Sequence, residues 1–137
     1  MLERKSFNVL GTALAGCFIP CKGFALESDV YGFLKAKLEP PWSCLRIEQK
    51  TADGTPDILL IKKHAYCLIE AKLLKQGILN DPVKQLHWQP GQIAFLKRAV
   101  RKGWRYMLVV GTNKGIWFIE GDKCNGIFYH TYPTAVF

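Results

Sequence analysis

The sequence predicts a single α/β domain in which helices flank one central β-sheet. The chain has 137 residues, the usual length of one domain. Hydrophobic residues make up 49% of it and charged residues 22%, which is typical of a packed globular fold and not of a disordered chain. Apolar residues recur with helical spacing in two segments and with strand spacing in several others. Their order (helix, three strands, helix, further strands) is typical of the α/β class.

The first predicted helix begins at about Leu26. Val30, Leu34 and Leu38 follow at intervals of four residues, which places them on one helical face. Pro40 and the proline after it end the helix, because the residue before a proline disfavours helical geometry. The segment is therefore expected to pack one apolar stripe against the sheet.

Three strands are predicted next, at about 42–49, 58–61 and 66–71, with a turn at 50–56. The second strand consists of four apolar residues in a row, Ile58–Ile61. Such a run is typical of a central strand that is buried on both faces. The third strand is also mostly apolar, so the two are expected to lie inside the sheet.

The second half of the chain contains the other predicted helix. Residues 75–89 are polar and predict a loop, or a short helix within a loop. Pro90 suits the first position of a helix that runs to Lys102 and ends at Gly103. Its apolar stripe is expected to consist of Ile93, Leu96, Ala99 and Val100.

Further strands are predicted at 106–110 and 115–120, and at 127–132 after a turn at 121–126. Residues 1–24 do not continue these patterns and are expected to form an N-terminal arm. The domain itself is then expected to span residues 25–137.

Cysteine usage and hydropathy indicate a cytoplasmic protein without a membrane partner. The five cysteines are scattered and include no C-x-x-C pair, which argues against a disulfide framework or a zinc site. The sequence has no run of about 18 apolar residues, the length that a membrane-spanning helix needs. One alternative stays open: Leu14–Cys17 is similar to a lipoprotein cleavage site, which would make the chain an exported or membrane-associated basic protein.

The charge distribution indicates a polyanionic partner. The chain has 19 Lys and Arg against 11 Asp and Glu, a net charge of +8. Residues 62–105 alone contain ten basic and two acidic residues, so the other 93 residues are neutral as a set. A polyanion such as nucleic acid is therefore the first partner to expect and an anionic membrane surface the second, while a cationic partner is disfavoured. The residues expected to contact phosphates are Lys75, Lys84, Lys97, Arg98, Arg101, Lys102 and Arg105. An ordinary solvated helix face is the alternative.

Two acids and a lysine stand where neighbouring strands begin and end. Asp57 precedes the second predicted strand, and Glu70 and Lys72 end the third, two positions apart and so on one side of it. If these strands form a hairpin, the three side chains meet at one end of the sheet. Two carboxylates provide oxygen ligands for Mg²⁺, and a lysine can orient water or stabilise charge on a phosphate. Charges at the end of an apolar strand are costly unless they are paired or bind a metal.

These residues resemble a known nuclease signature. Gly54–Asp57 reads Gly-Thr-Pro-Asp, and Glu70–Lys72 follows thirteen positions later as Glu-Ala-Lys. Together they are similar to the PD-(D/E)xK superfamily, and more narrowly to the VRR-NUC family of small nuclease domains, many of them stand-alone phage proteins. Glu27 on the first helix and Gln92 at the start of the second also match that family's pattern. The resemblance covers roughly residues 25–120 and implies a restriction-endonuclease-like core.

The resemblance also implies a role for each matched residue. Asp57, Glu70 and the backbone carbonyl of Ala71 would bind Mg²⁺, for which Mn²⁺ would substitute, and Lys72 would be the catalytic lysine. Gln92 would contact the site or the substrate, and Glu27 would be an accessory acid. From the residues alone, Glu27 and Gln92 could equally be polar positions in a first helical turn. Glu48 is a rival accessory ligand for Glu27.

The expected function is therefore that of a metal-dependent endonuclease acting on DNA, with junction-resolving relatives as one model for its substrate. A homodimer is expected because so small a chain offers little surface for a long duplex. A nucleic-acid-binding module that does not cut is the alternative. If the protein is phage-encoded, its compartment would be the host cytoplasm. His87 and Trp88, in the loop after the acids, either stack on a base or pack beneath the loop, and packing is favoured.

Overall fold

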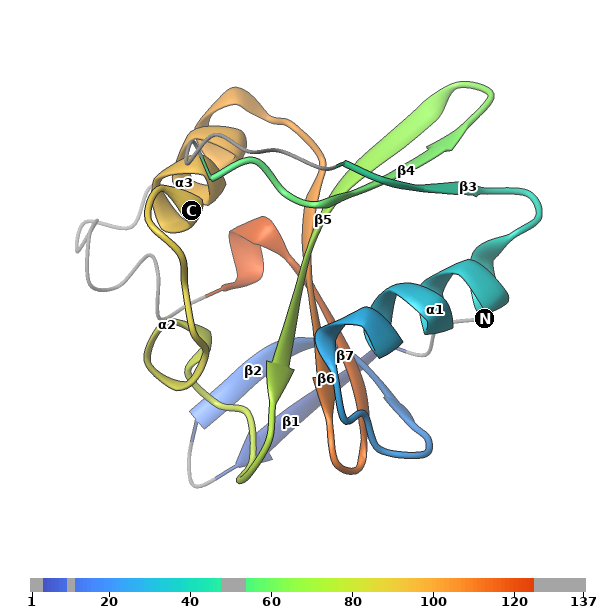
Figure 1. Ribbon diagram of the computed structural model, residues 1–137. Helices are drawn as coiled ribbons and strands as arrows, with labels where there is room; N and C mark the ends of the chain where they lie inside the picture. The colour runs from blue at the N-terminus through green and yellow to red at the C-terminus, as the bar shows by residue number, and fades with distance from the viewer. Residues whose placement is uncertain (1–3, 10–11, 48–53, 125–137) are drawn as a thin grey trace.

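The fold is a mixed β-sheet with helices on both faces (Figure 1). The computed structural model describes residues 4–9, 12–47 and 54–124. The predicted strand at 127–132, the rival acid Glu48 and residues 50–53 of the predicted turn lie outside them. In chain order the elements are β1 (Arg4–Val9), β2 (Thr12–Pro20), α1 (Glu27–Leu38), β3 (Ser43–Arg46), β4 (Ile58–Lys62), β5 (Ala65–Leu74), α2 (Pro82–Gln85), α3 (Gln92–Lys102), β6 (Tyr106–Thr112), β7 (Gly115–Glu120) and the 3₁₀ turn η1 (Gly121–Lys123).

The described part of the sheet has seven strands in the order β1-β2-β7-β6-β5-β4-β3. Only β5 and β6 run parallel, and every other neighbouring pair is antiparallel. The connection from β5 to β6 therefore crosses over the sheet, and it contains α2 and α3. The predicted α/β class with a central sheet between helices is confirmed.

Two hydrophobic cores lie on opposite faces of this sheet, one under α1 and one under α3 (Figure 1). Val30 and Leu34 of α1 are fully buried, as their spacing predicted. On the other face α3 buries Phe95, Leu96 and Ala99. The sheet residues of the first core include Ile58, Leu60, Ile69, Val109 and Phe118, and those of the second include Leu74, Leu108, Val110, Trp117 and Ile119.

The N-terminal segment that was expected to be an arm contains two strands of the same sheet. β1 pairs with β2, and β2 pairs with β7, with Cys17 opposite Phe118. Without β2 the outer side of β7 would be a long exposed edge, which proteins usually cover. Cys17 is buried against the α1 core. Residues 4–9 and 12–20 therefore belong to the same sheet as the rest of the domain, and the expected boundary after residue 24 is wrong.

The prediction that β4 is buried on both faces is wrong. Ile58 and Leu60 face the α1 core, but Ile61, which faces the opposite side, is 38% exposed. The exposed face continues onto the neighbouring strands, where Leu45 is 47% and Tyr66 is 42% exposed. β4 lies next to the short edge strand β3, so its apolar run does not mark the centre of the sheet.

The start predicted for α3 is also wrong by two residues. Pro90 lies in a turn, and the helix begins at Gln92 because Gly91 has a φ of 86°, in the left-handed region where a helix cannot continue. The end at Lys102, with Gly103 after it, agrees with the prediction. Within the described residues, no helix has both the length and the apolar character that a membrane span requires.

Candidate functional site

The hairpin of β4 and β5 brings the predicted acids together. The two strands are antiparallel, with Ile58 opposite Ile69. Continuing this register by one residue sets Asp57 opposite Glu70. Asp57 is half-buried, and its carboxyl group is hydrogen-bonded to the backbone of Ala71. The paired carboxylates that the spacing could only suggest therefore share one end of the hairpin.

Glu70 and Lys72 lie inside the protein, on the face of the sheet covered by α3. Glu70 is 2% exposed and Lys72 is 4% exposed. The Lys72 Nζ atom lies 3.9 Å from Glu70 Oε2. Burying two ionisable groups is unfavourable unless hydrogen bonds and opposite charges compensate. The neighbours of both side chains must therefore supply these hydrogen bonds.

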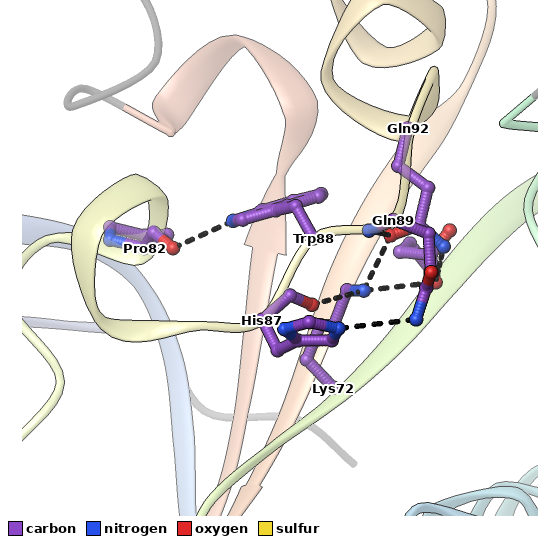
Figure 2. Close-up of polar contacts among 7 residues, drawn as sticks. Lys72, Pro82, His87, Trp88, Gln89 and Gln92 are labelled. Atoms are coloured by element: carbon purple, nitrogen blue, oxygen red, sulfur yellow. Dashed lines mark hydrogen bonds and ion pairs between the residues drawn. The ribbon is translucent and has the colours of Figure 1, made fainter.

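Lys72 is held by the loop and helix that follow β5 (Figure 2). Its Nζ donates to Gln92 Oε1 and to the backbone carbonyl of His87, both at 2.6 Å. The same atom lies 4.9 Å from the centre of the Trp88 ring, in cation–π geometry. These contacts satisfy the ammonium group and fix its position beside Glu70.

Gln92 joins the two charged residues from the first turn of α3 (Figure 2). Its Oε1 accepts from Lys72 and, at 2.7 Å, from the backbone N–H of Gln89. Its Nε2 donates to Glu70 Oε2 at 3.3 Å. Both ends of the amide are therefore used within the site, as expected of a residue that contacts it.

A close approach of two backbone turns explains how α3 reaches the acids. Gly54, three residues before Asp57, is buried and has a φ of 81°. A Cβ at Gly54 would overlap the carbonyl group of Gly91 and lie 2.6 Å from the backbone nitrogen of Gln92. Only glycine permits this contact at this φ. The turn before Asp57 therefore rests directly on the start of α3.

The site perturbs its own ionisable groups. Burial raises the pKa of Glu70 to about 8; the Lys72 ammonium lowers it, and the Asp57 and Glu27 carboxylates raise it. Burial likewise raises the pKa of Asp57 and lowers the pKa of Lys72. With a pKa near 8, Glu70 keeps its proton at neutral pH in the metal-free chain. A cation bound beside it would favour the ionised form.

The residues present fit a divalent cation with oxygen ligands. Asp57 Oδ1 and Glu70 Oε1 are buried and have no hydrogen-bond partner in the described part of the chain. Across residues 4–9, 12–47 and 54–124, no three His, Cys, Asp or Glu side chains group closely enough to hold a metal alone. Mg²⁺ needs no such cage, because it keeps several waters and uses one or two carboxylates. Ala71, the third ligand that the family resemblance implies, is buried between Glu70 and Lys72 on β5.

Glu27, the predicted accessory acid, is the first residue of α1 and is exposed. Its charge affects the pKa values of Glu70 and Lys72, so it lies within electrostatic range of the site. In the described part of the chain, no hydrogen bond or ion pair joins Glu27 to Glu70 or Lys72. The structure therefore places Glu27 at the margin of the site, on the α1 side of the sheet.

The predicted basic residues do not all surround the acids. Lys97, Arg98, Arg101 and Lys102 lie on α3, Arg105 follows that helix, Lys75 follows β5, and Lys84 is in α2. At about 1.5 Å per residue, Arg101 and Lys102 lie about 14 Å along the helix from Gln92. Arg98 stacks on Phe95 and Trp104, with its guanidinium carbon 5.2 Å and 5.8 Å from the ring centres. The positive charge therefore extends from the site along one helix.

Three groups contact the site in ways that the sequence did not predict. The His87 carbonyl is a backbone group, which every residue carries. Trp88 packs beneath the loop against the core under α3, as favoured, and its indole N–H donates to the carbonyl of Pro82 at 3.0 Å (Figure 2). The side chain of His87 is exposed, so the packing predicted for it is wrong. Gln89 Nε2 lies 3.2 Å from His87 Nε2, and only the folded loop brings them together.

No family model matches this sequence, and no curated protein matches it either.

Proposed function

We propose that the protein is a metal-dependent endonuclease that hydrolyses phosphodiester bonds in DNA. The observation that carries the proposal is the buried cluster of Asp57, Glu70, Lys72 and Gln92, in which two carboxylate oxygens have no partner. A merely structural ion pair would be expected to satisfy both oxygens of each carboxylate. Perturbed titratable groups of this kind are typical of functional sites.

The arrangement of the elements supports a restriction-endonuclease-like core. A helix, three antiparallel strands, a crossover helix and a parallel strand follow one another as α1, β3, β4, β5, α3 and β6. In this arrangement Asp57 comes from the turn before β4, Glu70 and Lys72 from β5, and Gln92 from α3. The order agrees with the resemblance to PD-(D/E)xK nucleases, of the VRR-NUC type, that the sequence suggests.

Asp57, Glu70 and the carbonyl of Ala71 are the residues that would bind Mg²⁺, or Mn²⁺ in its place. Bound there, the ion would supply charge neutralisation at the phosphate oxygens and a lower pKa for water. Lys72 is positioned to orient the attacking water, or to stabilise negative charge on the phosphate, once it exchanges one of its present acceptors. Gln92 holds Lys72 and Glu70 in fixed relation, so the geometry is set before the substrate arrives.

The basic residues on and after α3 would hold the DNA backbone. Contacts of this kind give affinity without sequence readout, and the affinity falls steeply with salt. A homodimer would supply a second site and a larger surface, and sedimentation with and without DNA tests it. A chain that stays monomeric under both conditions would contradict the dimer but not the nuclease.

The test is a cleavage assay with Mg²⁺ or Mn²⁺ on linear, supercoiled, single-stranded and four-way-junction DNA. Asp57→Asn, Glu70→Gln and Lys72→Met should each lower the cleavage rate at least about 100-fold. Circular dichroism should show that each variant keeps its fold. Lys37→Met is the matched control, because this lysine is exposed on α1, and it should cut like the wild type.

Two results would contradict the proposal. Full cleavage in excess EDTA would exclude a required divalent cation, and full activity of Glu70→Gln would exclude its proposed role. DNA binding without cleavage of any of the four substrates would favour the alternative, a nucleic-acid-binding module with a nuclease-like fold.

A further inference from the structure

The hydroxyl group of Tyr106 is buried without a hydrogen-bond partner in the described part of the chain. In the described part of the chain, three buried side-chain atoms lack a hydrogen-bond partner: Asp57 Oδ1, Glu70 Oε1 and the hydroxyl oxygen of Tyr106. The first two belong to the candidate metal site. Tyr106 is the first residue of β6 and is 5% exposed. Unsatisfied buried polar atoms are rare in folded proteins, so a third one needs an explanation.

The sheet register places Tyr106 next to Glu70. β5 and β6 are parallel, with Leu68 opposite Tyr106 and Glu70 opposite Leu108. Tyr106 and Leu108 both belong to the core beneath α3, the face on which Glu70 and Lys72 also lie. Tyr106 is therefore the diagonal neighbour of Glu70 on that face. With a strand spacing of about 4.8 Å and a rise of about 3.3 Å per residue, their Cα atoms lie about 8 Å apart.

The electrostatics agree with this placement. Burial raises the pKa of Tyr106, and the charges of Glu70, Cys124 and Asp57 raise it further, in that order. Asp57 precedes β4, beyond β5 from Tyr106, so its influence shows that the phenol lies within electrostatic range of both acids. The phenol stays protonated and is a hydrogen-bond donor.

The surroundings of the ring do not require a hydroxyl. Tyr106 packs among apolar residues, with the Phe95 ring 6.3 Å away. A phenylalanine would fill the same space. It would also avoid burying a hydroxyl group, which is unfavourable when that group has no hydrogen bond. The phenol is therefore a cost to the fold, and a role in the site accounts for it.

We propose that Tyr106 is a positioning residue of the metal site, whose O–H donates to Glu70 when that carboxylate binds the cation. Gln92 and Lys72 already contact Glu70 Oε2, whereas Oε1 has no partner. Each carboxylate oxygen has two lone pairs, so a donor at one lone pair of Oε1 would leave the other for the ion and would set the orientation of the carboxylate toward it. The inference rests on the proposed function, because that function assigns Glu70 as a ligand.

The test measures Mn²⁺ affinity by calorimetric titration of the full chain, without DNA. Tyr106→Phe should bind Mn²⁺ about ten-fold more weakly than the wild type, the usual scale for a residue that orients a metal ligand. Its melting temperature in EDTA should equal or exceed that of the wild type, since the ring is kept and a buried hydroxyl is lost. Tyr66→Phe, on the exposed end of β5, is the control and should change neither value.

Three other outcomes would contradict the proposed role of Tyr106. Equal Mn²⁺ affinity for Tyr106→Phe and wild type would overturn the role of Tyr106 and leave the proposed nuclease intact. A much lower melting temperature of Tyr106→Phe in EDTA would show that the hydroxyl has a structural partner, which also overturns it. If the wild type binds no Mn²⁺, the metal site itself fails, and this inference fails with it.

Discussion

At the scale of single residues, the main feature is that a carboxyl group and an amine lie side by side away from water. Glu70 and Lys72 are both nearly inaccessible to solvent. Burial raises the pKa of Glu70 and lowers the pKa of Lys72, so it favours the neutral form of each. The amide of Gln92, which is itself uncharged, hydrogen-bonds to both residues. The metal-free site is thus held by hydrogen bonds, and a cation would change its protonation.

This burial predicts a pH dependence of stability for the metal-free protein. The pKa of Glu70 is about 8 in the folded chain, against an ordinary value of 4.5. Between these values the unfolded chain has lost the proton and the folded chain retains it, so the free energy of unfolding falls as pH rises. The raised pKa of Asp57 acts in the same direction. Lys72, with its lowered pKa, acts oppositely, but only above its folded pKa.

Urea unfolding in EDTA at pH 5.5 and pH 8.5 checks this prediction. The wild type should lose stability at the higher pH, by an amount on the order of a few kcal/mol. Glu70→Gln cannot ionise and should lose most of that pH dependence, while being more stable than the wild type at pH 8.5. The same slope in wild type and variant would show that Glu70 is not the group responsible.

At the scale of secondary-structure elements, the contact between two turns positions the start of α3. Gly54 lies so close to the backbone of Gly91 that there is no room for a side chain at Gly54. This contact sets Gln92 beside Glu70, although the two residues come from different elements. Sequence reasoning predicted the end of this helix correctly. It could not show that Gly54 touches the start of the helix, because the approach depends on the path of the loop at 75–91.

Gly54→Ala should therefore destabilise the protein and impair the site. The new Cβ would overlap the Gly91 carbonyl, and the φ of 81° disfavours alanine as well. Gly77→Ala is the matched control: its φ is 87°, but no heavy atom lies within 4 Å of the Cβ position. Thermal unfolding should show a loss of about 1 kcal/mol for Gly77→Ala from the backbone alone and a clearly larger loss for Gly54→Ala. Equal losses would show that the contact with Gly91 does not matter.

At the scale of the whole molecule, positive charge and the candidate site lie along one helix. α3 has Gln92 at its start and Arg101 and Lys102 in its last turn, and no acidic residue lies on it. α1, on the opposite face, is mixed in charge, with Glu27 and Asp29 in its first turn and Lys35 and Lys37 in its last. Under the proposed function, this asymmetry favours α3 as the helix that would contact DNA.

Salt dependence of DNA binding tests this orientation. Lys102→Gln should weaken binding of a short duplex and reduce the slope of log affinity against log salt by about 1, as loss of one phosphate contact does. Lys37→Gln removes the same charge from α1 and should leave the slope unchanged. Fluorescence anisotropy with a labelled duplex in EDTA measures binding separately from cleavage. Equal effects of both substitutions would indicate that only net charge matters.

The sequence by itself determined the elements that local patterns encode. Helical spacing defined α1 and the end of α3, and the Pro-Asp and Glu-x-Lys segments pointed to Asp57, Glu70 and Lys72 as one site. The tertiary structure decided what depends on neighbours distant in the chain: that β2 covers β7, that β4 is exposed on one face, and that the loop at 87–89 encloses Lys72. Apolar periodicity reports which side of an element is buried, whereas contacts between elements depend on register and loop path. The partnerless hydroxyl of Tyr106 is of the second kind, since only the β5–β6 register places it diagonal to Glu70.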